Sequence, residues 1–229
     1  MNTVRIVSHN SVPFRDRIEA GELLGRELQK FRDRRAVVLG IPRGGVVVAR
    51  EVARALQAEL DIVLSRKLSA PWNPELAIGA ISEDGKLFLN KMLLSRVGAE
   101  SMYIQQEKAR QLAEIEHRTA LYRGIHPKVL LEGRLVIVTD DGLATGATMQ
   151  AALWTTRQEG PKKLIAALPV GPEDTVMRLA KDADEMICLR SPPLFDAIGQ
   201  FYKRFDQVED EEVVEILKEE HKMEGRKRT

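Results

Sequence analysis

The stretch from Leu135 to Met149, LVIVTDDGLATGATM, decides the expected fold of this 229-residue chain. It opens with four apolar residues, Leu135 to Val138, with no polar alternation, which is typical of a strand buried on both faces of a parallel sheet. Two carboxylates, Asp140 and Asp141, and a loop of small residues follow, and residues 149–158 have helical spacing. The stretch therefore predicts a strand, an acidic pair, a Gly/Thr loop and a helix.

The loop after the acidic pair has the chemistry of a phosphate site. Amides at the start of a helix point outward at the positive end of the helix dipole, and glycines let a phosphate approach the backbone closely. Ionised carboxylates only accept hydrogen bonds, so a neighbouring pair suits two hydroxyls better than a second phosphate. A phosphate beside a vicinal diol describes a ribose 5-phosphate. The patterns G-x-x-x-x-G-K-[ST] and G-x-G-x-x-G are absent, so neither a P-loop nor a dinucleotide site is expected. A tight structural turn with solvated acids is the alternative.

The same residues resemble the signature of the type I phosphoribosyltransferase family, in which two acidic residues and a T-G-x-T loop bind phosphoribosyl pyrophosphate (PRPP). Asp140, Asp141, Thr145, Gly146 and Thr148 match it position for position. The resemblance implies that the two aspartates act in catalysis by orienting the ribose hydroxyls. It also implies that the 5-phosphate is held by Gly142, Leu143, Ala144, Thr145, Gly146, Ala147 and Thr148.

A second apolar run, residues 36–41, also ends in a glycine-rich turn before a helical segment, residues 46–56. This turn holds Arg43, Gly44 and Gly45, so it forms a second anion nest in which an arginine can neutralise a diphosphate. The resemblance makes it the pyrophosphate loop. A structural turn with an exposed arginine is the other interpretation.

A third strand is expected at residues 60–65, followed by a loop over residues 66–74 that contains two prolines and two adjacent cations, Arg66 and Lys67. Residues 76–81 and 86–90 flank Asp-Gly and are expected to form the hairpin that carries this loop. The resemblance implies that the loop is mobile, that Arg66 and Lys67 bind pyrophosphate, and that Lys67 takes part in catalysis. A solvated loop cation is the alternative for Lys67.

Residues 91–128 are not part of the minimal core of this family and are expected to form a helical insertion. Residues 101–121 place one apolar stripe among many charges, which predicts a long amphipathic helix. We expect this insertion to form a homodimer, or else to pack only within its own chain.

Two segments near the ends of the chain are expected to form a small hood, residues 1–17 and 190–210. Asp16 and Glu19 have capping-box spacing, so a helix is expected to start there with Arg17 as part of a solvated first turn. The irregular segment 191–205, SPPLFDAIGQFYKRF, is rich in aromatics, which could build a slot for a planar ring or a plug that seals the sheet edge. In the family the hood selects the base, so the residues assigned to it are Phe14, Phe195, Phe201 and Tyr202.

Further strands are expected at residues 163–169 and 185–189, and a final helix at residues 209–220. Strands that alternate with helices predict one α/β domain over residues 1–229, with a doubly wound parallel sheet of about five strands in the order 2-1-3-4-5. This order would place the carboxyl ends of strands 1 and 3 beside the ligand crevice. Those ends carry the two predicted anion nests.

Composition limits the classes of partner. The chain has 35 Lys and Arg residues and 34 Asp and Glu residues, so its formal net charge is only +1. The overall electrostatic field therefore does not favour binding to nucleic acid or to an anionic membrane. The single cysteine, Cys188, lies in an apolar run and is expected to be a buried core residue without a disulfide. The four histidines are scattered, so no metal site is expected. No leader-like segment or membrane-length apolar run is found, so a cytoplasmic protein is expected.

The resemblance implies transfer of ribose 5-phosphate from PRPP to a nitrogenous base, with release of pyrophosphate and with Mg²⁺ bound together with PRPP. The implied partners are PRPP and a nucleobase-like acceptor. Ala144 stands where hypoxanthine-guanine and xanthine members carry an aspartate, which disfavours that substrate class. A PRPP-binding regulatory protein without transferase activity, and an α/β protein that binds another sugar phosphate, are the alternatives.

Overall fold

The computed structural model describes residues 3–227 and shows a central sheet of six parallel strands in the order β1-β9-β8-β7-β2-β3. The predicted order 2-1-3-4-5 corresponds to β3-β2-β7-β8-β9 and is confirmed. The strands are β1 (Thr3–Ser8), β2 (Val37–Gly40), β3 (Glu59–Ile62), β7 (Leu135–Thr139), β8 (Lys163–Val170) and β9 (Glu185–Arg190).

Strand β1 is the sixth strand of this sheet and was not predicted. Residues 3–8 were assigned to the hood, but they pair in parallel with β9, so that part of the hood assignment is wrong. The strand lies at the sheet edge and alternates between exposed and half-buried residues, with Val4 and Ile6 packed against the core. In the sequence polar and apolar residues alternate only from Thr3 to Ile6, because Val7 is apolar although it is 44% exposed, so the strand signal is weak.

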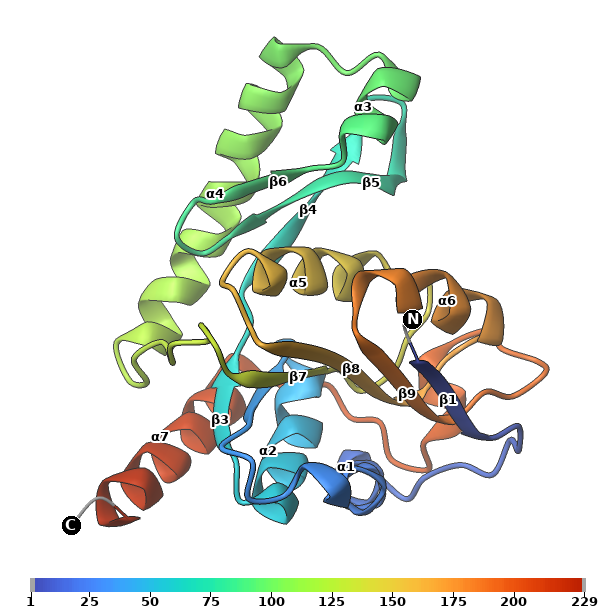
Figure 1. Cartoon of the computed structure of the whole chain (residues 1–229), viewed down its shortest axis with the longest axis vertical. Helices are drawn as coiled ribbons and strands as arrows, with labels where there is room; N and C mark the ends of the chain where they lie inside the picture. The colour runs from blue at the N-terminus through green and yellow to red at the C-terminus, as the bar shows by residue number, and fades with distance from the viewer. Residues whose placement is uncertain (1–2, 228–229) are drawn as a thin grey trace.

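Helices cover both faces of the central sheet (Figure 1). Helices α1 (Arg17–Glu27), α2 (Gly44–Leu56) and α7 (Asp210–Lys227) lie on one face, and α5 (Ala147–Arg157) and α6 (Glu173–Leu179) lie on the other. In β7, Ile137 packs into the first hydrophobic cluster while Val136 and Val138 pack into the second. Both faces of the strand are therefore apolar, which explains its uninterrupted hydrophobic run.

A second, three-stranded antiparallel sheet and two helices project from the core as an arm, residues 65–123 (Figure 1). Its elements are β4 (Ser65–Ala70), β5 (Asn73–Ser82), β6 (Leu87–Leu89), α3 (Lys91–Val97) and α4 (Ser101–Arg123). The predicted hairpin is confirmed as β5 and β6, and the predicted long helix as α4.

The predicted loop over residues 66–74 is wrong in its first half, because Arg66 and Lys67 lie in strand β4 and pair with β5. The strand is at the edge of its sheet, where cationic side chains are common, and it ends before Pro71. Pro71 therefore lies in the short turn between β4 and β5, and Pro74 is the second residue of β5.

Helix α5 is packed between the two sheets. It contacts β7 and β8 on one side and β4 and β5 on the other, so nine of its eleven residues are buried. The ring centroids of Trp154 on α5 and Phe88 on β6 are 4.7 Å apart. Because α5 begins at the predicted phosphate loop, this packing holds the arm next to that loop.

Short 3-10 helices complete the fold: η1 (Gln29–Phe31), η2 (Ala180–Asp182) and η3 (Ile198–Phe201). Cys188 is buried in β9, as predicted, and burial raises the pKa of its thiol to about 12. None of the helices within residues 3–227 combines the length and the hydropathy that a membrane span requires.

Candidate functional site

The two predicted anion loops touch at the carboxyl ends of β2 and β7, which are neighbours in the central sheet. A Cβ atom built on Gly45 would lie 2.8 Å from Asp140 Oδ1, and one built on Gly44 would lie 2.1 Å from Asp141 Oδ2. Any side chain at either position would collide with the acidic pair. These glycines therefore permit the close approach of the two loops that a single ligand bound to both would need.

The predicted 5-phosphate loop divides into anchoring and exposed residues. Leu143 is buried, and its N–H donates to the Val170 carbonyl at 2.8 Å. Gly146 has φ 78° and precedes α5 without a side-chain cap. The positive φ suits glycine, and the uncapped helix start offers backbone N–H groups to an anion. The exposed residues are Ala144, Thr145 and Thr148, and the buried ones are Gly142, Leu143, Gly146 and Ala147.

Neighbouring elements fix this loop. Arg178 on α6 donates through Nη2 to the Thr145 carbonyl at 2.5 Å. A Cβ on Gly142 would lie 2.6 Å from Ile198 Cγ2, so the segment after β9 packs directly against the start of the loop. The loop is thus held from two sides while Thr145 and Thr148 stay accessible.

The two aspartates have different environments. Arg17 Nε donates to Asp141 Oδ2 at 2.8 Å, and these two side chains are only 11% and 13% exposed. The N–H of Asp141 donates to Asp140 Oδ1 at 2.8 Å. Burial, together with the charge of Asp141, raises the pKa of the Asp140 carboxyl well above its ordinary range. Asp141 is therefore paired with a cation, whereas Asp140 keeps its proton to a higher pH than an ordinary aspartate does.

Arg17 is a site residue that the sequence analysis placed in a solvated first turn, which is wrong. Its Nη1 also donates to the Asp206 carbonyl at 2.7 Å, and its guanidinium lies 3.9 Å from the centroid of the Phe205 ring. The helix start was predicted correctly, since the Asp16 side chain caps the Glu19 N–H at 3.0 Å. The partner of Arg17 lies 124 residues away, so local spacing held no signal for it.

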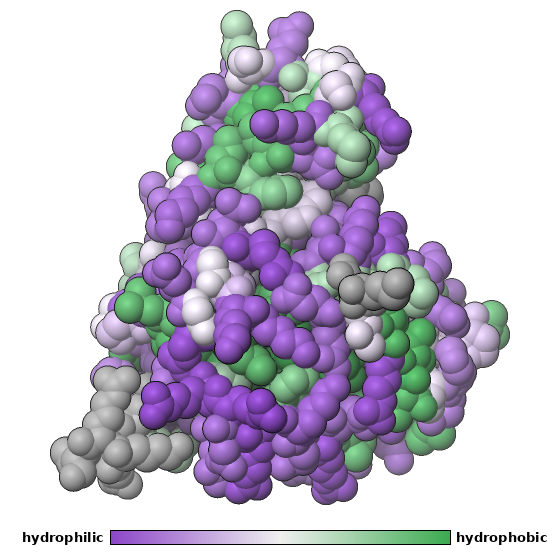
Figure 2. Space-filling view, viewed as in Figure 1, coloured by the Kyte–Doolittle hydropathy of each residue, from purple (hydrophilic) through white to green (hydrophobic). Residues whose placement is uncertain are grey.

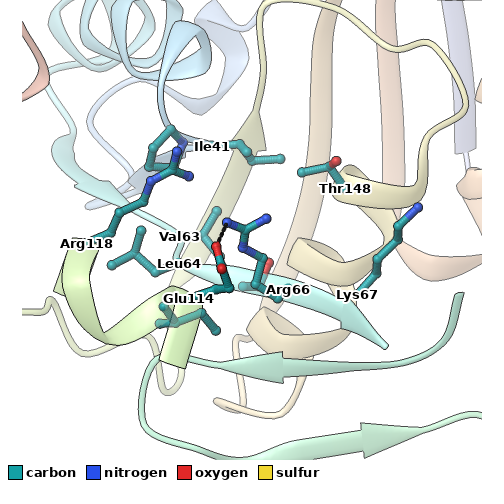
Figure 3. A pocket seen from close by; sticks show the side chains of 11 residues that line it. Ile41, Val63, Leu64, Arg66, Lys67, Glu114, Arg118 and Thr148 are labelled. Atoms are coloured by element: carbon teal, nitrogen blue, oxygen red, sulfur yellow. Dashed lines mark hydrogen bonds and ion pairs between the residues drawn. The ribbon is translucent and has the colours of Figure 1, made fainter. Parts of the chain in front are cut away.

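A pocket of about 270 Å³ lies between the core and the arm (Figure 3). Arg66 and Lys67 on β4, Arg118 on α4 and Thr148 at the start of α5 line it. Arg66 pairs with Glu114 at 3.4 Å. The structure thus brings two of the three predicted pyrophosphate cations, Arg66 and Lys67, to one pocket with Thr148 of the predicted 5-phosphate loop. Arg118, which sequence reasoning missed, lines the same pocket.

Arg43 precedes α2, and the Pro42–Arg43 peptide bond is cis. The Arg43 guanidinium donates through Nη1 to Glu209 Oε2 at 3.0 Å, and the Glu209 side chain is largely exposed. An anion bound at this loop would have to compete with that carboxylate for the arginine.

The predicted hood residues form a largely closed aromatic cluster. Phe14, Phe201 and Tyr202 are buried, and the Phe14 and Tyr202 ring centroids are 5.4 Å apart. Tyr202 also donates its hydroxyl to the Asp141 carbonyl. Segment 191–205 had two interpretations, a slot for a planar ring and a plug at the sheet edge. The burial of Phe201 and Tyr202 against Phe14 supports the plug. Phe195 keeps exposed surface and lines a separate cavity of about 640 Å³ with His9 and other residues.

The chain is thus a doubly wound α/β protein with an acidic pair and two glycine-rich loops at adjacent strand ends, where proteins of this fold class bind ligands. A sequence profile of the phosphoribosyl transferase domain matches residues 16–202. The chain belongs to the phosphoribosyl transferase family.

Comparison with individual proteins agrees with this assignment. A Mycobacterium tuberculosis protein named "Putative phosphoribosyl transferase Rv0571c" is 44% identical over 209 residues, which cover 91% of this chain and 47% of that protein. The crystal structure of TT1426 from Thermus thermophilus superposes with a TM-score of 0.87 at 47% identity, covering 91% of this chain and 99% of that one. The ribose-phosphate pyrophosphokinase of Sulfurisphaera tokodaii is 32% identical over 109 residues, 47% of this chain and 33% of that protein. The matched part of the chain therefore corresponds to about half of the length of the mycobacterial relative.

Proposed function

We propose that this protein transfers ribose 5-phosphate from PRPP to the nitrogen of a base and releases pyrophosphate. The observation that carries the proposal is the direct contact of Gly44 and Gly45 with Asp140 and Asp141. One ribose lying over the acidic pair would have its 5-phosphate at the start of α5 and its pyrophosphate beside the Arg43 loop and the basic pocket. The mycobacterial relative is named a putative phosphoribosyl transferase, and the name of the Sulfurisphaera tokodaii relative refers to ribose phosphate and pyrophosphate.

In the proposed reaction the bond between the anomeric carbon and pyrophosphate breaks, and its electron pair leaves with the pyrophosphate oxygen. The lone pair of the acceptor nitrogen forms the new carbon–nitrogen bond. Positive charge develops on the ribose and negative charge on the leaving group. Arg66, Lys67 and Arg118 line the pocket in which that negative charge would be stabilised.

We propose that Mg²⁺ binds at this site together with the substrate. Across residues 3–227 no group of three or more His, Cys, Asp or Glu side chains is arranged to hold a metal ion. Mg²⁺ commonly binds through one or two carboxylates and substrate phosphates, and Asp140 and Asp141 can supply the carboxylates. When bound, the ion would neutralise charge on the pyrophosphate.

We propose that the acceptor approaches from the hood side. Of the four residues assigned to the hood, Phe195 is the one that retains exposed surface beside a cavity. The absence of an aspartate at Ala144 continues to disfavour a hypoxanthine-guanine or xanthine acceptor. A planar nitrogenous base of another class is the proposed substrate.

The test is calorimetric titration with PRPP and Mg²⁺, followed by an assay of pyrophosphate release across a panel of bases. We expect binding, and release with at least one base. Asp140→Asn should weaken PRPP binding by about tenfold or more, because one carboxyl oxygen that could accept from a ribose hydroxyl is replaced by an NH₂ group. Asp196→Asn, at an exposed aspartate outside the site, is the control. Binding without turnover would instead identify a PRPP-binding regulatory protein, and no binding would contradict both functions.

Asp141 is less suited to this test, because its ion pair with Arg17 also contributes to the stability of the fold. Asp141→Asn would leave the enclosed Arg17 guanidinium without its counter-ion. Breaking one partner of such a pair costs about 2–4 kcal/mol, slightly less than for a fully buried pair. A loss of PRPP binding in that variant would therefore mix stability with recognition.

A further inference from the structure

A second large hollow opens at the edge of the central sheet opposite to the candidate site. Its volume is about 700 Å³. The strands are parallel, so the segments just before β2, β7, β8 and β9 meet at one edge, about 15 Å from the carboxyl ends for a five-residue strand. The hollow is lined by Arg34, Arg35, Gly133, Arg134, Leu135, Arg157, Lys162, Lys163 and Asp184.

Positive charge dominates this hollow. Three of its six cations are paired with carboxylates: Arg157 with Asp184 at 3.0 Å, Lys163 with Glu185 at 2.8 Å and Arg134 with Glu59 at 3.1 Å. The other three, Arg34, Arg35 and Lys162, are exposed, and within residues 3–227 they make no ion pair. A concave surface of one sign concentrates counter-ions. The excess is local, since the whole chain has a formal net charge of +1.

Hydrogen bonds join the segments that carry these cations. Arg134 donates through Nε and Nη2 to the Arg35 carbonyl at 3.0 and 2.8 Å. The N–H of Lys162 donates to the Arg134 carbonyl at 2.8 Å. Asp184 accepts from both guanidinium nitrogens of Arg157 and from the Leu164 N–H. The backbone around the hollow is therefore fixed before a ligand arrives, which lowers the entropy cost of binding.

We propose that this hollow binds a chain of two or three phosphates. Its volume lies in the range of small-molecule sites. Guanidinium forks and a lysine without carboxylate partners match phosphate oxygens well. Within residues 3–227 no aromatic side chain lines the hollow, so the lining residues suit the phosphate chain and provide no stacking surface for a base. The phosphate chain can come from a free oligophosphate or from a nucleoside triphosphate.

The test is calorimetric titration without Mg²⁺, using tripolyphosphate and ATP in turn as probes. The background variant Lys67→Gln with Arg118→Gln removes cations of the candidate active site, so that binding there does not interfere. Adding Arg34→Gln and Lys162→Gln should weaken tripolyphosphate binding by about tenfold or more. The matched control adds Lys91→Gln and Arg96→Gln, which removes the same charge from exposed positions on α3.

Each result of these titrations either supports or contradicts the proposed phosphate site. Equal binding of tripolyphosphate and ATP supports recognition of the phosphate chain alone, and tighter binding of ATP supports a nucleoside triphosphate as its source. Unchanged binding in the Arg34→Gln, Lys162→Gln variant, or an equal loss in the α3 control, would overturn the proposal. So would binding of single-stranded DNA, lost in the same variant, without binding of tripolyphosphate. None of these results depends on turnover at the candidate site.

Discussion

At the scale of single residues, the two carboxyl groups of the acidic pair have different electrostatic environments. Asp141 has Arg17 against it, whereas the pKa of Asp140 is raised by burial and by the charge of Asp141. When a carboxyl group has a higher pKa in the folded state, the folded state binds more protons above the unfolded pKa of about 3.9. Stability therefore falls as the pH rises from that value through the folded pKa.

Asp140→Asn should remove this dependence, because the amide does not ionise. The melting temperature of the variant minus that of the wild type should be near zero at pH 4 and should become more positive toward pH 8. Thermal denaturation followed by circular dichroism over this range measures the difference, with Asp196→Asn as the exposed control. A difference that stays constant with pH would show that Asp140 ionises as an ordinary aspartate.

The residues that could be predicted from sequence are those whose neighbours in space are also neighbours in the chain. Asp140, Asp141 and Thr148 belong to one strand–loop–helix unit, so their order along the chain reflects their arrangement. Arg17 and Arg118 reach the site from other elements, and long-range packing decides where they point. No periodicity or spacing rule contains that information.

At the scale of elements, β4 and α4 bring cations from the arm to the start of α5. Arg118 lies on α4 and lines the pocket that also contains Arg66 and Lys67 (Figure 3). If pyrophosphate binds there, Arg118→Gln should raise the dissociation constant of PRPP about tenfold or more, since a hydrogen bond to a charged group contributes about 1.5–3 kcal/mol. Calorimetric titration with PRPP and Mg²⁺ measures this change.

The control for this prediction is Arg96→Gln on α3, which removes one exposed positive charge from the same arm. Both variants should keep the melting temperature of the wild type, because Arg118 is half-buried and Arg96 exposed. Wild-type affinity in Arg118→Gln would place pyrophosphate outside this pocket.

The elements themselves were predictable to different degrees. Strand β7 is apolar on both faces, so its sequence gave a strong strand signal. Helix α5 was also predicted, although its buried residues include the polar Gln150, Thr155 and Thr156. Strands β1 and β4 lie at sheet edges, where exposed polar and charged side chains weaken the hydrophobic pattern. In β4 the two prolines nearby suggested a loop, although Pro71 only ends the strand.

At the scale of the whole molecule, the arm exposes large apolar side chains. Trp72, Met92 and Met102 are 94%, 73% and 70% exposed, and α3 contributes no buried residue. Figure 2 shows a hydrophobic area on the arm. Exposed apolar surface of this kind is typical of protein interfaces. We propose that a second copy of the chain covers this surface, so that the arm, which includes the insertion over residues 91–128, forms a homodimer.

This proposal predicts a dimer in sedimentation velocity experiments at micromolar concentration. Trp72→Ser combined with Met102→Ser should shift the population toward monomer, because both changes remove apolar contact area from the arm. Leu130→Ser with Leu194→Ser is the matched control, since these side chains are 84% and 81% exposed but lie outside the arm. A wild-type monomer at this concentration would contradict the proposal. Because Lys67 and Arg118 belong to the arm, a dimer that restrains it would also fix the basic pocket, so the monomeric variant should bind PRPP more weakly than the control.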